Sequence, residues 1–170
     1  MEFFTSDTHF GHANIVRYCN RPFDSIEEMD EAIISNWNRV VSKSDTVYHL
    51  GDFSFKDPFI YKKRLNGKIV LIRGNHDHKF KNLQKIFDSV YDLLSLKLHG
   101  YYLVLSHYSM RVWDRSHYNS YNIYGHSHGR LPEYGKSYDV GVDSNNYTPI
   151  NFGDLMEILD TKPNNFNYRG

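Results

Sequence analysis

The chain has 170 residues, 40% of them hydrophobic and 24% charged, which is typical of one globular domain with a substantial core. Its 20 basic and 20 acidic residues leave a formal net charge of zero, which argues against an extended nucleic-acid groove or an acidic membrane surface as partner. No run reaches the roughly 18 apolar residues that a membrane span needs. Cys19 is the single cysteine, which excludes an internal disulfide and favours a reducing cytoplasm. The chain is expected to enter a strand at once, which leaves no room for a signal peptide.

The first half of the chain predicts strands and helices in alternation. Ser25 begins a helix with a capping-box pattern, because Glu28 stands at the third position after it. Met29, Ile33 and Trp37 then recur at a spacing of four residues, so one face of this helix should pack inward. The expected elements are strands at 3–6, 46–50 and 68–72, a helical turn at 14–18, and helices from 25, from 58 to about 65 and from 77 to about 87.

The second half is rich in predicted strands. Segments 90–98 and 101–106 flank a His99-Gly100 turn and predict a hairpin. Residues 108–120 are polar and aromatic, and we expect a loop that lies over the functional site. Further strands are expected at 121–124, 137–142 and 155–159. The whole chain therefore predicts an α/β protein with one domain, residues 1–160, and a mobile tail at 161–170.

Four short segments combine Asp, His or Asn with small, turn-prone residues, and each follows a predicted strand. They are Asp7-Thr8-His9, Gly51-Asp52, Gly74-Asn75-His76-Asp77 and Gly125-His126-Ser127-His128, with His107 at the end of a further strand. The carboxyl ends of strands in an α/β sheet are where ligands collect. Carboxylate oxygens beside neutral imidazoles suit divalent ions such as Mn, Fe, Zn or Ni. So many ligands indicate two ions, and two ions indicate hydrolysis of a phosphate ester.

The spacing within these segments supports the same interpretation. Asp7 and His9 are two residues apart, as are His126 and His128, and in an extended segment this spacing turns both side chains to one face. Asp52 has two oxygens and could bridge two ions, and the glycine before it allows a close approach of the backbone. Each segment alone is weak evidence, because Gly-Asp and Gly-Asn pairs are ordinarily turns. The prediction depends on the complete set in this order.

The ordered set resembles the calcineurin-like metallophosphoesterase superfamily, and the resemblance extends from about residue 3 to 158. The opening, from Ser6 to Ile15, is similar to that of a subgroup of small bacterial and phage phosphoesterases. The resemblance implies a four-layer αββα sandwich of two mixed β-sheets flanked by helices. It also implies a cofactor of two divalent metal ions, with Mn as the first choice and Fe, Zn, Ni or Co as alternatives.

The resemblance further implies a role for individual residues. The implied ligands are Asp7, His9 and His128 for the first ion, Asn75, His107 and His126 for the second, and Asp52 between them. His76 would contact the phosphate and assist the leaving group, and Asp77 would orient His76 by accepting its other ring N–H. A hydroxide that bridges the two ions would attack phosphorus, because two cations lower the pKa of bound water.

Substrate contacts are less specific in the sequence. The candidates are His12, Asn14, Arg17 and Arg73, which suit a phosphate or the edge of a nucleotide. Three of them also have an ordinary structural explanation: His12 could cap the following turn, Arg17 could lie on a solvated helix face, and Arg73 could pair with a carboxylate such as that of Asp77. These residues therefore remain open at the level of the sequence.

The function expected from these observations is hydrolysis of a phosphodiester in a small, nucleotide-like substrate. A phosphomonoesterase for nucleotides or phosphoproteins is the close alternative, and a nuclease for DNA or RNA ends is a third. A non-catalytic interaction scaffold is the alternative outside enzymes, although scaffolds of this kind typically lose ligands or the residue equivalent to His76. No membrane partner is expected, and a monomer and a homodimer both remain open.

Overall fold

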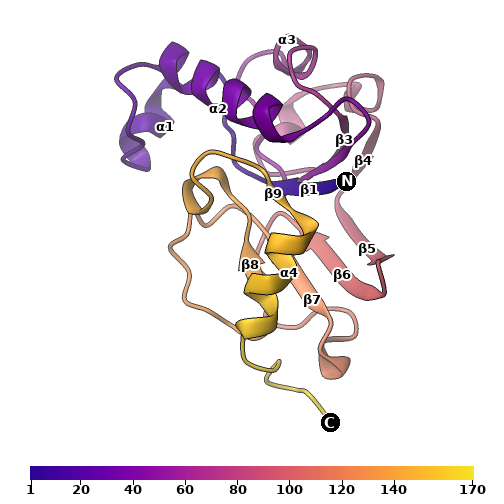
Figure 1. Ribbon diagram of the computed structural model, residues 1–170. Helices are drawn as coiled ribbons and strands as arrows, with labels where there is room; N and C mark the ends of the chain where they lie inside the picture. The colour runs from indigo at the N-terminus through magenta and orange to yellow at the C-terminus, as the bar shows by residue number, and fades with distance from the viewer.

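The computed structural model describes residues 1–170 and contains two mixed β-sheets with helices around them (Figure 1). One sheet has the order β4-β3-β2-β1-β9, and the other has the order β5-β6-β7-β8. The strands are β1 (Glu2–Thr5), β2 (Thr46–His49), β3 (Lys68–Ile72), β4 (Ser89–Tyr91), β5 (Leu93–Leu98), β6 (Tyr101–Ser106), β7 (Tyr121–Tyr124), β8 (Ser137–Asp139) and β9 (Ile150–Asn151). The helices are α1 (Ala13–Tyr18), α2 (Ile26–Val40), α3 (Pro58–Lys62) and α4 (Phe152–Thr161). The predicted α/β class with two mixed sheets is confirmed.

The direction of the strands brings distant loops to one edge. Strands β1 to β4 are parallel and β9 is antiparallel, while β6, β7 and β8 are parallel and β5 is antiparallel. The carboxyl ends of β1, β2 and β3 therefore meet, and those of β6, β7 and β8 do the same. A bridge between Ser6 and Gly141 joins the ends of β1 and β8, so the two edges adjoin.

Two apolar clusters hold this arrangement. Ser25 caps α2 by accepting a hydrogen bond from the backbone N–H of Glu28 at 3.1 Å, as the capping-box pattern predicts. Met29, Ile33 and Trp37 of α2 are buried against the five-stranded sheet. The second cluster joins the two sheets and α4. In Figure 1, α1, α2 and α3 lie at the end of the molecule away from the four-stranded sheet.

The prediction of a strand at 155–159 is wrong, because this segment belongs to α4. The side chain of Asn151 accepts a hydrogen bond from the backbone N–H of Asp154 at 3.0 Å and caps the helix. Leu155 and Leu159 are both fully buried and stand one helical turn apart. A short apolar run does not distinguish helix from strand, and here the cap and the one-sided burial select the helix.

Other boundaries also differ from the sequence prediction. The helix expected at 77–87 consists of two single 3-10 turns, Asp77–Lys79 and Leu83–Lys85, because Asn82 between them has a left-handed backbone with φ 59°. The strand expected at 90–98 divides at Asp92 between β4 and β5, which lie in different sheets. The remaining differences are small: α3 ends at Lys62 and β8 ends at Asp139.

The segment after α4 lies against the residues that precede β7 and β8. The side chain of Asn165 is buried, accepts a hydrogen bond from the backbone N–H of Lys136 at 2.8 Å and donates one to the carbonyl oxygen of Ser116 at 2.9 Å. The mobility of residues 161–170 and the single-domain boundary at 160 stay predictions. No helix in the chain is both long enough and apolar enough to cross a membrane.

Replacing Leu155 by Ala should lower the free energy of unfolding by about 2–5 kcal/mol, because it leaves a cavity where α4 packs against both sheets. Urea unfolding followed by circular dichroism measures this change. Glu157→Ala, at an exposed position of the same helix, is the control and should change the free energy by less than about 0.5 kcal/mol. Equal effects of the two substitutions would contradict the buried face assigned to α4.

Candidate metal centre

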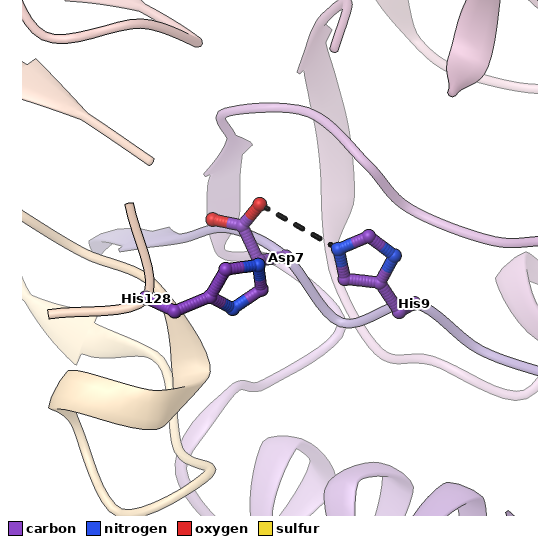
Figure 2. Close-up of side chains that lie close together, drawn as sticks. All are labelled: Asp7, His9 and His128. Carbon is purple, nitrogen blue, oxygen red and sulfur yellow. Dashed lines mark ion pairs between the residues drawn. The ribbon is translucent and has the colours of Figure 1, made fainter. Parts of the chain in front are cut away.

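The first group of candidate ligands comes from the ends of β1 and β7. Asp7 and His9 follow β1, and His128 follows β7, and donor atoms from these three side chains lie within 4.8 Å of one another. Figure 2 shows the three side chains around a common point, with 3.8 Å between Asp7 Oδ1 and His9 Nε2. The structure therefore brings together three residues separated by up to 121 positions in the chain, His128 being 121 after Asp7.

The second group adjoins the first. Asp52, His107 and His126 offer donor atoms within 4.8 Å of one another, and Asn75 Oδ1 lies 3.1 Å from His107 Nε2. Asp52 Oδ2 is 3.7 Å from His9 Nε2 in the first group and 3.6 Å from His107 Nε2 in the second. The carboxylate of Asp52 thus lies between the two groups, where a bridging ligand would have to be.

The first group carries buried polar atoms that the protein leaves unpaired. Asp7 Oδ1 and both ring nitrogens of His9 are buried and have no hydrogen-bond partner. Burial raises the pKa of Asp7 to about 7, and burial together with the charge of Arg21 lowers the pKa of His9. Unpaired buried acceptors are rare in native proteins, and a bound cation would satisfy Asp7 Oδ1 and the ring nitrogen of His9 that carries a lone pair.

Hydrogen bonds also prepare two of the histidines for an ion. The Nδ1–H of His107 donates to the carbonyl oxygen of Leu50 at 2.7 Å, and the Nδ1–H of His128 donates to Asp143 Oδ2 at 2.7 Å. These two acceptors cannot donate a hydrogen bond, so the ring proton lies on Nδ1. The lone pair of Nε2 is therefore free to bind an ion. A set of two carboxylates, an amide oxygen and four imidazoles fits divalent transition metals.

Backbone strain is common among the candidate ligands. The candidate ligands with a left-handed backbone are Asp7, His9, Asp52, His126 and His128, with φ of 58°, 50°, 56°, 66° and 49°. Gly51 has φ 98°, and a β-carbon there would lie 2.5 Å from His107 Nδ1 and from the backbone nitrogen of Gly74. A β-carbon at Gly125 would lie 1.9 Å from Ser6 Oγ. Glycine is needed at these two positions because the loops of different strands approach so closely.

Asp77 holds the backbone of two ligand loops. Its carboxylate is buried and accepts hydrogen bonds from the backbone N–H groups of Asp52 (2.8 Å), Phe53 (3.1 Å) and Gly74 (2.8 Å). Burial raises the pKa of Asp77, and these three hydrogen bonds oppose that effect. We expected Asp77 to accept the ring N–H of His76; the carboxylate instead joins the ends of β2 and β3.

His76 lies at the mouth of the site. Its Nε2 is 3.8 Å from Asp52 Oδ2, and its side chain is 40% exposed. Its backbone N–H donates to Asp52 Oδ1 at 2.9 Å. Phe55 contacts this ring at a centroid distance of 4.7 Å and stacks on His12 at 3.6 Å. Two imidazoles thus face the space beside the ligands, and burial lowers the pKa of His12.

A cleft of about 440 Å³ opens beside the candidate ligands. Its walls include the predicted residues His9, His12, Asp52, His76, His126 and His128, and also Ile15, Tyr18, Cys19, Phe55 and Arg130, which sequence reasoning did not select. Arg130 is two residues after His128, so its position was a signal that could have been used. Asn14 and Arg17 do not line this cleft; they contact each other at 3.4 Å on the exposed face of α1.

The other sequence candidates lie outside this cleft. Arg73 pairs with Asp92 at 2.6 Å, rather than with Asp77, and lines a separate hollow beside His107. In segment 108–120, Tyr108 reaches the site, where its hydroxyl donates to Asn75 Oδ1 at 3.3 Å. Arg115 and Tyr118 instead line a hollow at the amino ends of β6 and β7, so this part of the loop does not lie over the site as predicted.

A buried arginine stands behind the first group of ligands. Arg21 forms an ion pair with Asp143, whose carboxylate also accepts the His128 hydrogen bond. Burial alone would raise the pKa of Asp143, but the bonds from His128 and Arg21 lower it below the ordinary value. Burial alone would lower the pKa of His128, but Asp143 and Asp7 raise it.

Comparisons with known proteins place this geometry in a family context. The family model for the calcineurin-like phosphoesterase superfamily domain matches residues 3–166. An uncharacterised protein of Methanocaldococcus jannaschii is 38% identical over 167 residues, which cover 91% of this chain and 89% of that protein. The gene 66 protein of Mycobacterium phage L5 is 39% identical over 80 residues, 44% of this chain and 38% of that protein.

A solved structure is also similar to this chain. The crystal structure of a protein of unknown function from Aquifex aeolicus has a TM-score of 0.74 and 28% sequence identity, and the match covers 93% of this chain and 98% of that one.

Asp77→Asn should lower the free energy of unfolding by about 1–3 kcal/mol, because one amide oxygen cannot accept three backbone N–H groups and the new NH₂ is buried beside them. Urea unfolding of the metal-free protein measures this effect. Asp88→Asn is the control, since the partly exposed Asp88 carboxylate accepts one backbone N–H, from Ile69, and forms a surface ion pair with Lys62 that is worth less than about 1 kcal/mol. Unchanged stability with reduced turnover would instead support the orientation of His76 by Asp77.

Proposed function

The chain belongs to the calcineurin-like phosphoesterase superfamily and is a phosphoric ester hydrolase, and from this premise we propose that it is a two-metal phosphodiesterase for small, nucleotide-like substrates. The observation that carries the proposal is the position of Asp52 Oδ2, 3.7 Å from His9 Nε2 and 3.6 Å from His107 Nε2. One carboxylate between two groups of ligands is the arrangement that a pair of ions requires.

We assign the ligands in the two groups that the side chains form. Asp7, His9 and His128 would hold one divalent ion, Asn75, His107 and His126 would hold the other, and Asp52 would contact both. When bound, such ions supply positive charge to the phosphate oxygens and lower the pKa of water toward neutrality. Mn is our first choice for both ions, since mixed oxygen and nitrogen donors suit it, as they suit Fe, Zn, Ni and Co.

His76 is the residue that we assign to the leaving group. Its ring faces the cleft beside Asp52, and contact with Phe55 limits its orientation. From this position it can donate a proton to the leaving oxygen or a hydrogen bond to the phosphate. The chain needs no nucleophilic side chain of its own, because water attacks phosphorus directly in this chemistry.

The cleft supports a substrate of nucleotide size. Its volume of about 440 Å³ lies in the range of small-molecule sites. Tyr18 is 61% exposed at its wall and offers an aromatic face, and the guanidinium of Arg130 donates to the carbonyl oxygen of Tyr18 at 2.7 Å. The ring of Tyr18 could stack on a nucleotide base, and the guanidinium of Arg130 could bind a phosphate. The single cysteine remains our reason to propose a cytoplasmic location.

The reaction is tested with bis-p-nitrophenyl phosphate and p-nitrophenyl phosphate, with added Mn²⁺ and with a chelator. We expect turnover of the diester that requires Mn²⁺, is abolished in Asp52→Asn, and falls by about 10²–10⁴-fold in His76→Ala. His78→Gln, an exposed histidine outside the cleft, should retain wild-type turnover. Preference for the monoester would favour a phosphomonoesterase, and no Mn²⁺-dependent turnover of either ester would contradict the proposal for these substrates.

The wall of the cleft is tested with Tyr18→Ala and a nucleotide diester. Loss of base stacking worth about 1–3 kcal/mol should raise KM at least about fivefold while kcat and Mn²⁺ affinity change little. Tyr118→Ala is the matched control, because this tyrosine is 71% exposed at the opposite end of the four-stranded sheet. If both substitutions leave KM unchanged, the substrate does not use the α1 wall.

A further inference from the structure

We infer that Arg21 and Asp143 form a buried positioning pair, which holds His128 and the Asp7 loop in the geometry of the first ion site and thereby decides whether the chain binds one ion or two. This inference rests on the proposed two-metal function. Neither residue belongs to the two ligand groups assigned above; both lie outside the ligand segments and are 122 positions apart.

Arg21 makes contacts with two parts of the site at once. Its side chain is completely buried, and its Nε and Nη2 donate to the two carboxylate oxygens of Asp143 at 2.9 and 2.8 Å. The same guanidinium donates to the carbonyl oxygens of Asp7 at 2.7 Å and Thr8 at 3.1 Å. One rigid planar group therefore fixes the distance between the loop after β1 and the turn at Val142–Ser144.

Asp143 transmits this position to His128. Its Oδ2 accepts the Nδ1–H of His128 at 2.7 Å, which sets the ring orientation and leaves Nε2 as the free nitrogen. Asp7 and His128 belong to the same group of candidate ligands. The pair therefore acts on two ligands of one ion, through the backbone of Asp7 and through the ring of His128.

The second group of ligands is held mainly by different contacts, and the one direct hydrogen bond between the groups runs from the backbone N–H of His126 to Asp7 Oδ2 at 2.8 Å. His107 donates to the carbonyl oxygen of Leu50, and the backbone around Asp52 and Gly74 is held by Asp77. Neither Arg21 nor Asp143 hydrogen-bonds to Asn75, His107 or His126. Loss of the pair should therefore weaken the first ion site much more than the second, whereas a merely structural pair would have no such selectivity.

Mn²⁺ titration by calorimetry and electron paramagnetic resonance of the loaded protein test the inference together. The wild type should bind two Mn²⁺ and give the spectrum of a spin-coupled pair. In Asp143→Ala one site should weaken by about 10–100-fold, and the spectrum should become that of a single Mn²⁺. Asp143→Asn keeps an acceptor for the His128 N–H and should recover part of the Mn²⁺ affinity. Arg21→Lys keeps the positive charge but loses the paired hydrogen bonds to the two carboxylate oxygens of Asp143, so it should weaken the same site.

Arg64→Lys is the matched control, since Arg64 forms an exposed ion pair with Glu31 and should leave both sites unchanged. The inference is overturned if the variants bind two Mn²⁺ with wild-type affinity and still give the spectrum of a coupled pair. It is also overturned if both sites weaken equally while the unfolding temperature of the metal-free protein falls. If Asp143→Ala does not fold, Asp143→Asn and Arg21→Lys decide by the same readouts. A wild type that binds a single ion contradicts the two-metal function itself, and this inference with it.

Discussion

The left-handed backbone at the ends of the parallel strands is the constraint on which this site depends. Each such residue with a β-carbon costs about 1–3 kcal/mol, and five of the candidate ligands adopt it. Contacts between the loops impose this conformation: the backbone N–H of Asp7 donates to the carbonyl oxygen of Gly51 at 3.0 Å, and that of His9 donates to Asp52 at 3.0 Å. The sharp turns that follow direct side chains from several strands toward one point, which straight strand ends could not do.

The acidic residues around this point divide into two kinds. Asp7 and Asp52 each direct one carboxylate oxygen to the histidines and use the other to accept a backbone N–H. Asp77 and Asp143 use both oxygens to accept hydrogen bonds from the backbone or from other side chains. Arg21 is the buried cation that offsets this concentration of carboxylates. Burial of so much negative charge disfavours the metal-free protein, so bound cations should stabilise the fold as well as supply the chemistry.

Much of the site was predictable because its signal is local. Asp7, His9, Asp52, Asn75, His107, His126 and His128 each follow a strand that can be read from a short apolar run, and parallel strands bring such positions to one edge. The prediction was wrong where local patterns were ambiguous. Residues 155–159 fit either a strand or a helix, and the distinction depended on an Asn151 cap and on burial against both sheets.

The sequence by itself determined the α/β class, the family and the donor atoms gathered at the strand ends, because these depend on residue types at short spacings. The tertiary structure alone decided what holds those atoms in place. Asp77 was expected to contact its neighbour His76, but its carboxylate joins two loops whose amides lie up to 25 positions away. Arg21 and Asp143, 122 positions apart, meet behind His128 only because β1, β7 and β8 bring their loops to a common edge. A hydrogen bond between such distant groups has no local pattern; it is fixed by the packing of the two sheets.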